Sequence, residues 1–133
     1  MSKSEQDAAE VLTAARQLVD AFARFDKASY FASFRDDASF IFYNSEVVFP
    51  DRSSYEKEWE TWVADGWKVL ECTSQGGAVK MLDENTGLFT HEVFTTVDTP
   101  EGPSKLHERE TILFSRQASS WLGVHEHLSS FPV

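Results

Sequence analysis

Basic residues are scarce in this chain. Its 133 residues include 12 lysines and arginines against 22 aspartates and glutamates, which gives a formal net charge of −10 at pH 7. A surface of that sign repels nucleic-acid phosphates and anionic lipid headgroups. The charge therefore argues against a nucleic acid or a membrane surface as a partner.

Cysteine is limited to one residue, Cys72, so the chain can form no intramolecular disulfide. The residues on either side of it, Glu71 and Thr73, provide no histidine that would activate the thiol as a nucleophile. We expect a structural role for this cysteine.

Long apolar runs are also missing. No stretch approaches the ~18 apolar residues that a membrane-spanning helix needs. The first ten residues, MSKSEQDAAE, are polar and lack the apolar segment of a secretory signal. These two features predict a cytoplasmic protein.

Aromatic residues, in contrast, are plentiful. The chain contains 11 Phe, 4 Trp and 3 Tyr, and 41% of its residues are hydrophobic. That supply is ample for one core in a chain of this length. We expect residues 1–133 to form a single domain with a partly aromatic core.

The N-terminal segment carries helix signals. Ser4 and Asp7 have the spacing of a capping box, and apolar residues then recur at helical spacing as far as Phe25. Asp26 can cap a second, shorter helix over residues 28–34. Two consecutive helices are therefore predicted before the first strand.

The middle of the chain predicts a strand and a third helix. The aromatic stretch at 38–44 suits a strand, and residues 45–52 suit a short strand or turn. Ser53 and Glu56 have the spacing of a capping box, and the helix that they begin ends at Gly66.

From Trp67 onward only strands are predicted, divided by the turn-like segments QGG, DENTG, DTPEGP and RQASS. The predicted strands are 67–74, 78–83, 87–97, 105–116 and 121–129. Helices followed by long strands indicate an α+β fold. We expect a strongly curved, mostly antiparallel sheet that wraps around the N-terminal helices as a cone-shaped half-barrel and leaves a cavity between them.

The C-terminal stretch ERETILFSRQASSWLGVHEHLS and the DDAS segment at 36–39 carry a family resemblance. The residues that match are Glu110, Thr111, Arg116, Trp121, Val124, His125, His127, Ser129 and Pro132. They resemble the last two strands of SnoaL-like proteins of the nuclear transport factor 2-like superfamily, and most closely the association domain of calcium/calmodulin-dependent kinase.

This resemblance implies a cystatin-like, ketosteroid isomerase-like α+β barrel with a pocket open at one end. It also implies a homodimer that forms through the sheet. Relatives isomerise steroids, cyclise polyketides, bind small acids or serve assembly only, so the fold by itself selects no chemistry.

Side-chain alternation places His125 and His127 on the same face of the last strand as Trp121. A tight turn in RQASSW would set His127 opposite Glu110, and a similar count across DTPEGP brings Glu92 next to it. The face predicted to line the pocket contains Glu92, Phe94, Glu108, Glu110, Ile112, Phe114, Trp121, His125 and His127.

A His127–Glu110 pair on this face has three interpretations: a structural hydrogen bond, a ligand-binding group, or a general acid–base pair. The carboxylate would favour imidazolium, so the pKa of His127 is expected above ~6.5. A metal site is a weaker alternative because β-carbons at i and i+2 lie roughly 7 Å apart and His-x-His is unspecific. The resemblance implies no metal, and we expect neither a metal nor a cofactor.

One departure from the superfamily argues against a known mechanism. Its ketosteroid isomerases carry a catalytic aspartate on the first strand, shortly after a DDA-type segment. That place here holds Phe42 or Tyr43, and neither can act as a carboxylate base. Tyr43 and Tyr30 could still donate a hydrogen bond to a ligand.

The opposite face of the sheet is expected to carry His91, His107 and Arg109, with Arg109 reaching Glu126 in a structural salt bridge. If the inner and outer faces were exchanged, Arg109 would instead anchor an anion in the pocket.

The sequence thus predicts a homodimeric small-molecule-binding or assembly module whose ligand is not specified. The alternative is an isomerase, dehydratase or cyclase in which His127 and Glu110 act as acid and base. The outer-face residues predicted to mediate the dimer are Leu113, Leu122, Val124 and Leu128. The predicted ligand-binding residues are Tyr43, Glu92, Phe94, Glu110, Ile112, Trp121, His125 and His127.

Overall fold

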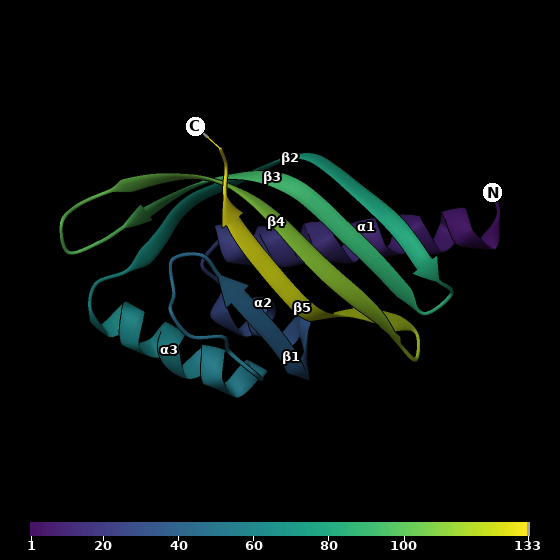
Figure 1. Cartoon of the computed structure of the whole chain (residues 1–133), viewed down its shortest axis with the longest axis horizontal. Helices are drawn as coiled ribbons and strands as arrows, with labels where there is room; N and C mark the ends of the chain where they lie inside the picture. The colour runs from purple at the N-terminus through teal and green to yellow at the C-terminus, as the bar shows by residue number, and fades with distance from the viewer. Residues whose placement is uncertain (133) are drawn as a thin grey trace.

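Three helices cover one face of a five-stranded sheet in the computed structural model, which describes residues 1–132 (Figure 1). The helices are α1 (Lys3–Ala23), α2 (Lys27–Ala32) and α3 (Arg52–Ala64). The strands are β1 (Phe34–Phe42), β2 (Lys68–Asp83), β3 (Thr86–Asp98), β4 (Ser104–Gln117) and β5 (Ser120–Ser130). The predicted α+β class is confirmed.

The strands lie in the order β1-β5-β4-β3-β2 in a curved, unclosed sheet (Figure 1). Within residues 1–132, β1 pairs with β5 in parallel, and the other neighbouring strands pair antiparallel as one meander. The core lies between the sheet and the helices and is rich in aromatic side chains. The predicted half-barrel around the N-terminal helices is therefore confirmed. No helix within residues 1–132 is long and apolar enough to cross a membrane.

The N-terminus of α1 is fixed by a capping box, but not by the predicted one. The Ser2 hydroxyl accepts a hydrogen bond from the Glu5 backbone N–H (3.1 Å), and the Glu5 carboxylate accepts one from the Ser2 N–H (3.2 Å). Asp7, expected to complete a box with Ser4, is buried and forms an ion pair with Arg116 at 2.8 Å. The misassigned aspartate thus ties α1 to β4.

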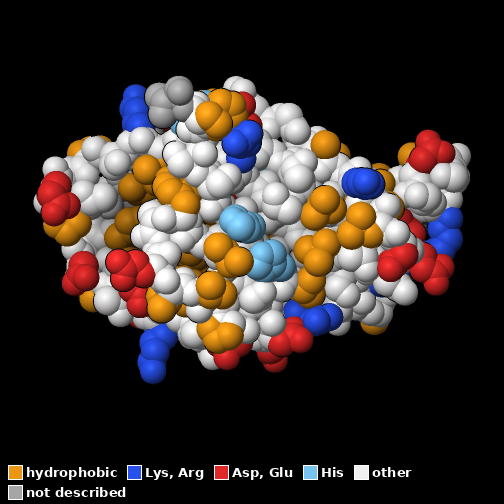
Figure 2. Space-filling model, viewed as in Figure 1, with side chains coloured by type: hydrophobic (Ala, Val, Ile, Leu, Met, Phe, Trp, Pro, Cys, Tyr) orange, Lys and Arg blue, Asp and Glu red, His pale blue; other side chains and the backbone are white. Residues whose placement is uncertain are grey.

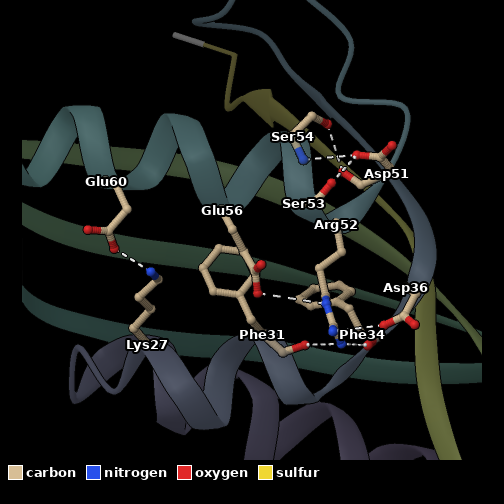
Figure 3. A network of polar contacts seen from close by, with 10 residues as sticks. All are labelled: Lys27, Phe31, Phe34, Asp36, Asp51, Arg52, Ser53, Ser54, Glu56 and Glu60. Atoms are coloured by element: carbon tan, nitrogen blue, oxygen red, sulfur yellow. Dashed lines mark hydrogen bonds and ion pairs between the residues drawn. The ribbon is translucent and has the colours of Figure 1, made fainter.

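The N-cap of α3 is Asp51, whose carboxylate accepts a hydrogen bond from the Ser54 backbone N–H at 2.9 Å (Figure 3). The predicted capping box of Ser53 and Glu56 is wrong, because the helix begins earlier, at Arg52. Its predicted end near Gly66 is confirmed.

Arg52 joins the start of α3 to the junction of α2 and β1 (Figure 3). Its guanidinium donates to the backbone carbonyls of Phe31 (3.3 Å) and Phe34 (2.8 Å) and pairs with the Asp36 carboxylate at 2.8 Å. These carbonyls lie where a helix ends and a strand begins, a place where backbone carbonyls often need partners from outside the helix. The contacts hold together the two helices that carry Tyr30 and Tyr55.

The segments 67–74 and 78–83, predicted as two strands, form the single strand β2. The QGG segment between them forms a bulge rather than a turn: Gly76 has a φ of +64°, and pairing with β3 resumes at Ala78. The bend that this bulge allows contributes to the curvature of the sheet.

The pairing of β4 with β5 changes at a second bulge. Pairing follows the predicted register from the turn as far as Gly123, after which Val124 is an extra residue without a partner on β4. Beyond the bulge, Glu110 lies opposite Leu128 instead of His127. A shift of one residue turns every later side chain to the other face. The predicted His127–Glu110 pair is therefore wrong.

The predicted register of β3 with β4 is wrong by one residue as well. His91, and not Glu92, lies opposite Glu110, while Glu92 lies opposite Arg109. As a consequence, His91 occupies the inner face that was predicted for Glu92.

Candidate functional site

A cavity of about 470 Å³ lies between the inner face of the sheet and the helices. The residues of β2 to β5 that line it are Cys72, Val93, Thr95, Val97, Leu106, Glu108, Glu110, Glu126 and Leu128. They gather there because alternate side chains of β3, β4 and β5 point toward the helices, with the bulge at Val124 bringing Glu126 onto that face.

The opposite wall of the cavity is mostly apolar and aromatic. Its residues come from the helices, the loops and the end of β1, and include Leu18, Val19, Phe22, Tyr30, Phe42, Tyr55, Trp62 and Trp67. Exposed lining residues such as Asp65 and Glu101 mark its mouth. The cavity thus has an apolar body and carboxylates in its wall and at its mouth.

The deepest polar groups form a continuous chain of hydrogen bonds. On one side of Glu110, its Oε1 lies 2.7 Å from Nε2 of His91, whose Nδ1 lies 2.6 Å from the Ser74 hydroxyl. On the other side, the carboxyl groups of Glu110 and Glu126 hydrogen-bond each other.

The series of hydrogen bonds continues from Glu126 to tyrosines on the helices. The Tyr30 hydroxyl donates to Oε1 of Glu126 at 3.1 Å and lies 2.9 Å from the Tyr55 hydroxyl. Since Tyr30 uses its proton on the carboxyl group, Tyr55 donates to Tyr30. No fully buried side-chain nitrogen or oxygen within residues 1–132 lacks a hydrogen-bond partner.

Burial determines which groups in this series of hydrogen bonds carry a proton. It lowers the pKa of His91 to about 4, so the ring is neutral at pH 7 and donates from Nε2 to the Glu110 carboxylate. Burial also raises the pKa of Glu110 to about 7. The pKa of Glu126 is raised well above its ordinary value, first by burial and then by the charge of Glu110. Glu126 is therefore the protonated member that donates to Glu110.

A second carboxylate lies on the same strand, two residues before Glu110. Glu108 is only 3% exposed and accepts a hydrogen bond through Oε2 from the Tyr43 hydroxyl at 2.8 Å. Burial, followed by this hydrogen bond, raises the pKa of Tyr43 to about 12, so the hydroxyl remains a donor at neutral pH.

The lone cysteine also lines the cavity. Burial raises the pKa of the Cys72 thiol to about 11, and Thr95 donates a hydrogen bond to its sulfur at 3.5 Å. A thiol that stays protonated at neutral pH is a poor nucleophile.

A family model described as the SnoaL-like domain matches residues 11–133, almost the whole sequence. The chain belongs to the SnoaL-like family. Comparison with curated protein sequences finds no match.

Solved structures with the same fold as this SnoaL-like protein share little of its sequence. A ketosteroid isomerase-like protein from Erwinia carotovora atroseptica is 14% identical with a TM-score of 0.79, over 96% of this chain and 98% of its own. The CaMKII hub of S. rosetta is 22% identical with a TM-score of 0.74, over 93% and 96%. An NTF2-like protein from Rhodospirillum rubrum is 16% identical with a TM-score of 0.77, over 90% and 97%. These likenesses establish the fold.

Of the residues predicted to bind a ligand, Glu110 alone lines the cavity of this SnoaL-like protein. Ile112 is fully buried in the core, and Trp121 packs at the edge of the core, where its indole N–H donates to Glu10 at 3.2 Å. Tyr43 reaches the cavity wall indirectly, through Glu108.

The remaining predicted residues lie on the outer face of the sheet. His107 pairs with Glu92 at 2.8 Å and stacks on Phe94 with ring centroids 4.2 Å apart. His125 lies 2.8 Å from the Ser39 hydroxyl through Nδ1, and its ring is 6.2 Å from that of His127. Glu92 and His127 line a second, more open pocket together with His91 and Glu110. Phe94 and His125 line neither that pocket nor the cavity.

The predicted salt bridge between Arg109 and Glu126 is also wrong, since the two lie on opposite faces. Arg109 lies over the Phe131 ring, 5.3 Å from its centroid, on the outer face.

Sequence reasoning missed Glu126 and His91 as site residues because both registers were displaced by one residue. The sequence contained one signal for the bulge that turns Glu126 inward. A glycine within a strand often marks a bulge or a close approach, and Gly123 directly precedes Val124. A β-carbon at Gly123 would lie 2.7 Å from Cδ1 of the fully buried Phe34.

Among residues 1–132, no group of three His, Cys, Asp or Glu side chains has an arrangement that could hold a metal ion. The three buried carboxyl groups of the cavity, those of Glu108, Glu110 and Glu126, interact with a histidine, a tyrosine or each other. Hydrogen bonding and proton exchange are the chemistry that this arrangement can offer.

Proposed function

We propose that this SnoaL-like protein binds a small, largely apolar molecule in the cavity, with the polar end of the ligand at the carboxyl groups of β4 and β5. The observation that carries the proposal is the cavity itself, about 470 Å³ in volume, between the sheet and the helices. Ligand sites in proteins are typically concave, about 300–1,000 Å³, apolar for the most part, and supplied with a few converging polar groups. Each of these features is present.

Filling the cavity should abolish binding. Leu128→Trp places an indole in the cavity, whereas Leu82→Trp adds the same group at an exposed position of β2 that is 53% accessible. With tryptophol, a neutral indole alcohol, we expect calorimetric binding to wild type and to Leu82→Trp and its loss in Leu128→Trp. Equal binding by all three proteins would contradict the proposed site.

Acid–base catalysis of the isomerase, dehydratase or cyclase type is a second candidate. It is favoured by the pKa of about 7 for Glu110 next to a protonated Glu126 in the wall of a cavity. A base that titrates near the working pH contributes about 10²–10⁴-fold to a proton transfer. Since His127 points to the other face, the acid–base pair in this candidate is Glu126 and Glu110.

We further propose that the protein self-associates through the outer face of the sheet. No helix covers this face, and Figure 2 shows histidine side chains near its centre among hydrophobic ones, with most acidic side chains toward the ends and lower edge. Its half-buried apolar residues include Phe94, Leu113, Leu122, Val124 and Phe131. Leu128, predicted to be among them, lines the cavity instead. An uncovered apolar face of this kind favours association with a second copy.

A charge in the middle of this face should produce a monomer. Leu122→Asp would bury an unpaired carboxylate in the interface, which costs several kcal/mol, while Leu82→Asp places the same charge at an exposed site. In sedimentation velocity at micromolar concentration we expect a dimer of the 15.1 kDa chain for wild type and Leu82→Asp. The Leu122→Asp variant should sediment as a monomer. A monomeric wild type would contradict the proposal.

A further inference from the structure

The cavity has one sign of charge. Its acidic lining residues are Asp65, Glu101, Glu108, Glu110 and the protonated Glu126, and its lining within residues 1–132 includes no lysine, arginine or histidine. Carboxylates without a cation nearby repel an anionic ligand and favour a cation or a hydrogen-bond donor. The electrostatics of the site therefore select among the small molecules that would fit its apolar body.

Glu108 adds a specific acceptor to this general preference. One of its oxygens, Oε2, is used by Tyr43, whereas Oε1 accepts no hydrogen bond from any residue in the described part of the chain. Yet every fully buried side-chain oxygen there has a partner, so Oε1 must border the cavity that Glu108 lines. Glu108 is only 3% exposed, and burying a carboxylate is costly unless its oxygens accept hydrogen bonds. A ligand donor in the cavity would satisfy the open oxygen.

Aromatic rings surround the approach to these carboxylates. Phe22, Tyr30, Trp62 and Trp67 line the cavity from the helical side. Their faces attract a cation and pack against a ring, so they suit both ends of an organic amine.

From these observations, and building on the proposed ligand-binding function, we propose that the cavity binds a small primary amine with an apolar, ring-bearing body. The ammonium group donates to the open oxygen of Glu108, and the ring lies against the aromatic wall. The ammonium group supplies the counter-charge that burial otherwise denies Glu108, so ligand charge and carboxylate ionisation stabilise each other.

Three indole compounds of similar size test the charge preference: tryptamine, tryptophol and indoleacetate, which carry an ammonium, a hydroxyl and a carboxylate. By calorimetry at neutral pH, tryptamine should bind wild type roughly ten- to hundredfold more tightly than tryptophol, the range expected for one charge-assisted hydrogen bond. Indoleacetate should bind more weakly than either.

The variant Glu108→Gln keeps the shape of the side chain and removes its charge. Tryptamine affinity should fall roughly tenfold or more, while tryptophol affinity should stay unchanged and thereby report an intact cavity. Glu92→Gln, on the outer face, should change neither affinity.

Indoleacetate binding as tightly as tryptamine, or tryptamine binding unaffected by Glu108→Gln, would overturn the amine preference. In either case, tryptophol binding that Leu128→Trp abolishes would leave the proposed ligand-binding function standing. If none of the three compounds binds wild type, both proposals fail.

Discussion

The free energy of unfolding of this SnoaL-like protein should fall by about 3 kcal/mol as the pH rises from about 6.5 to about 8.5. The cause is the buried carboxyl pair. The folded chain holds a proton on Glu126, and up to about pH 7 on Glu110 as well, while the unfolded chain has released both near the ordinary glutamate pKa of 4.5. Where the folded state binds more protons than the unfolded state, stability declines with rising pH.

The pKa shift of His91 changes stability with pH in the opposite direction to the carboxyl pair. It therefore sets the lower limit of this pH window. Its pKa of about 4 in the folded state lies below the ordinary 6.5, so its contribution to stability is present above pH 6.5 and is lost as the pH falls toward 4. Below pH 6.5 the histidine and the carboxyl pair therefore partly cancel. Above pH 6.5 the carboxyl pair dominates.

Two isosteric variants identify the groups responsible. Glu110→Gln and Glu126→Gln should each flatten the decline, because an amide imitates a protonated carboxyl group and does not titrate. Glu92→Gln, which changes a carboxylate on the outer face, should retain the wild-type slope. Urea unfolding at three pH values within the window measures all four proteins. A wild-type stability that does not change across this window would contradict the raised pKa values of the buried pair. It would thereby also contradict the acid–base candidate.

The secondary structure was largely predictable from local patterns. The period of apolar residues in α1, the aspartate before α2 and the turn-like segments between the strands each depend on residues close in sequence. The errors arose where a local signal had two interpretations. Ser4–Asp7 has the spacing of a capping box, yet Ser2–Glu5 forms the box, and QGG could be either a turn or a bulge.

The composition of the site was less predictable because it depends on strand register. Alternation along β4 correctly places Glu108 and Glu110 on the same, inner face of the sheet. One extra residue at Val124 then exchanges His127 for Glu126, and one residue of displacement at the β3–β4 turn exchanges Glu92 for His91. A bulge is stabilised by packing between distant segments, here Gly123 against Phe34, and alternation within one strand cannot reveal it.

Trp59→Ala should lower the free energy of unfolding by about 3–5 kcal/mol, the usual cost of truncating a fully buried large aromatic side chain. Trp59 is 1% exposed. Its ring stacks on Tyr30 (centroids 5.4 Å apart) and on Phe25 (5.6 Å), and meets the edge of Trp67 at 4.9 Å. The loss is a large part of the roughly 5–15 kcal/mol by which a domain of this size is stable. It should also loosen Tyr30, the donor to Glu126.

Trp62→Ala is the matched control, because Trp62 lies one turn further along α3, is only partly buried, and lines the cavity. Removing it should cost less stability, about 1–2 kcal/mol, but weaken tryptophol binding by removing part of the aromatic wall. Urea unfolding and calorimetry on the two variants separate these roles, since one tryptophan supports the core and the other contacts the ligand. If Trp62→Ala were the more destabilising variant, the core would not be centred on Trp59. If it left tryptophol affinity unchanged, the ligand would not contact the helical wall of the cavity.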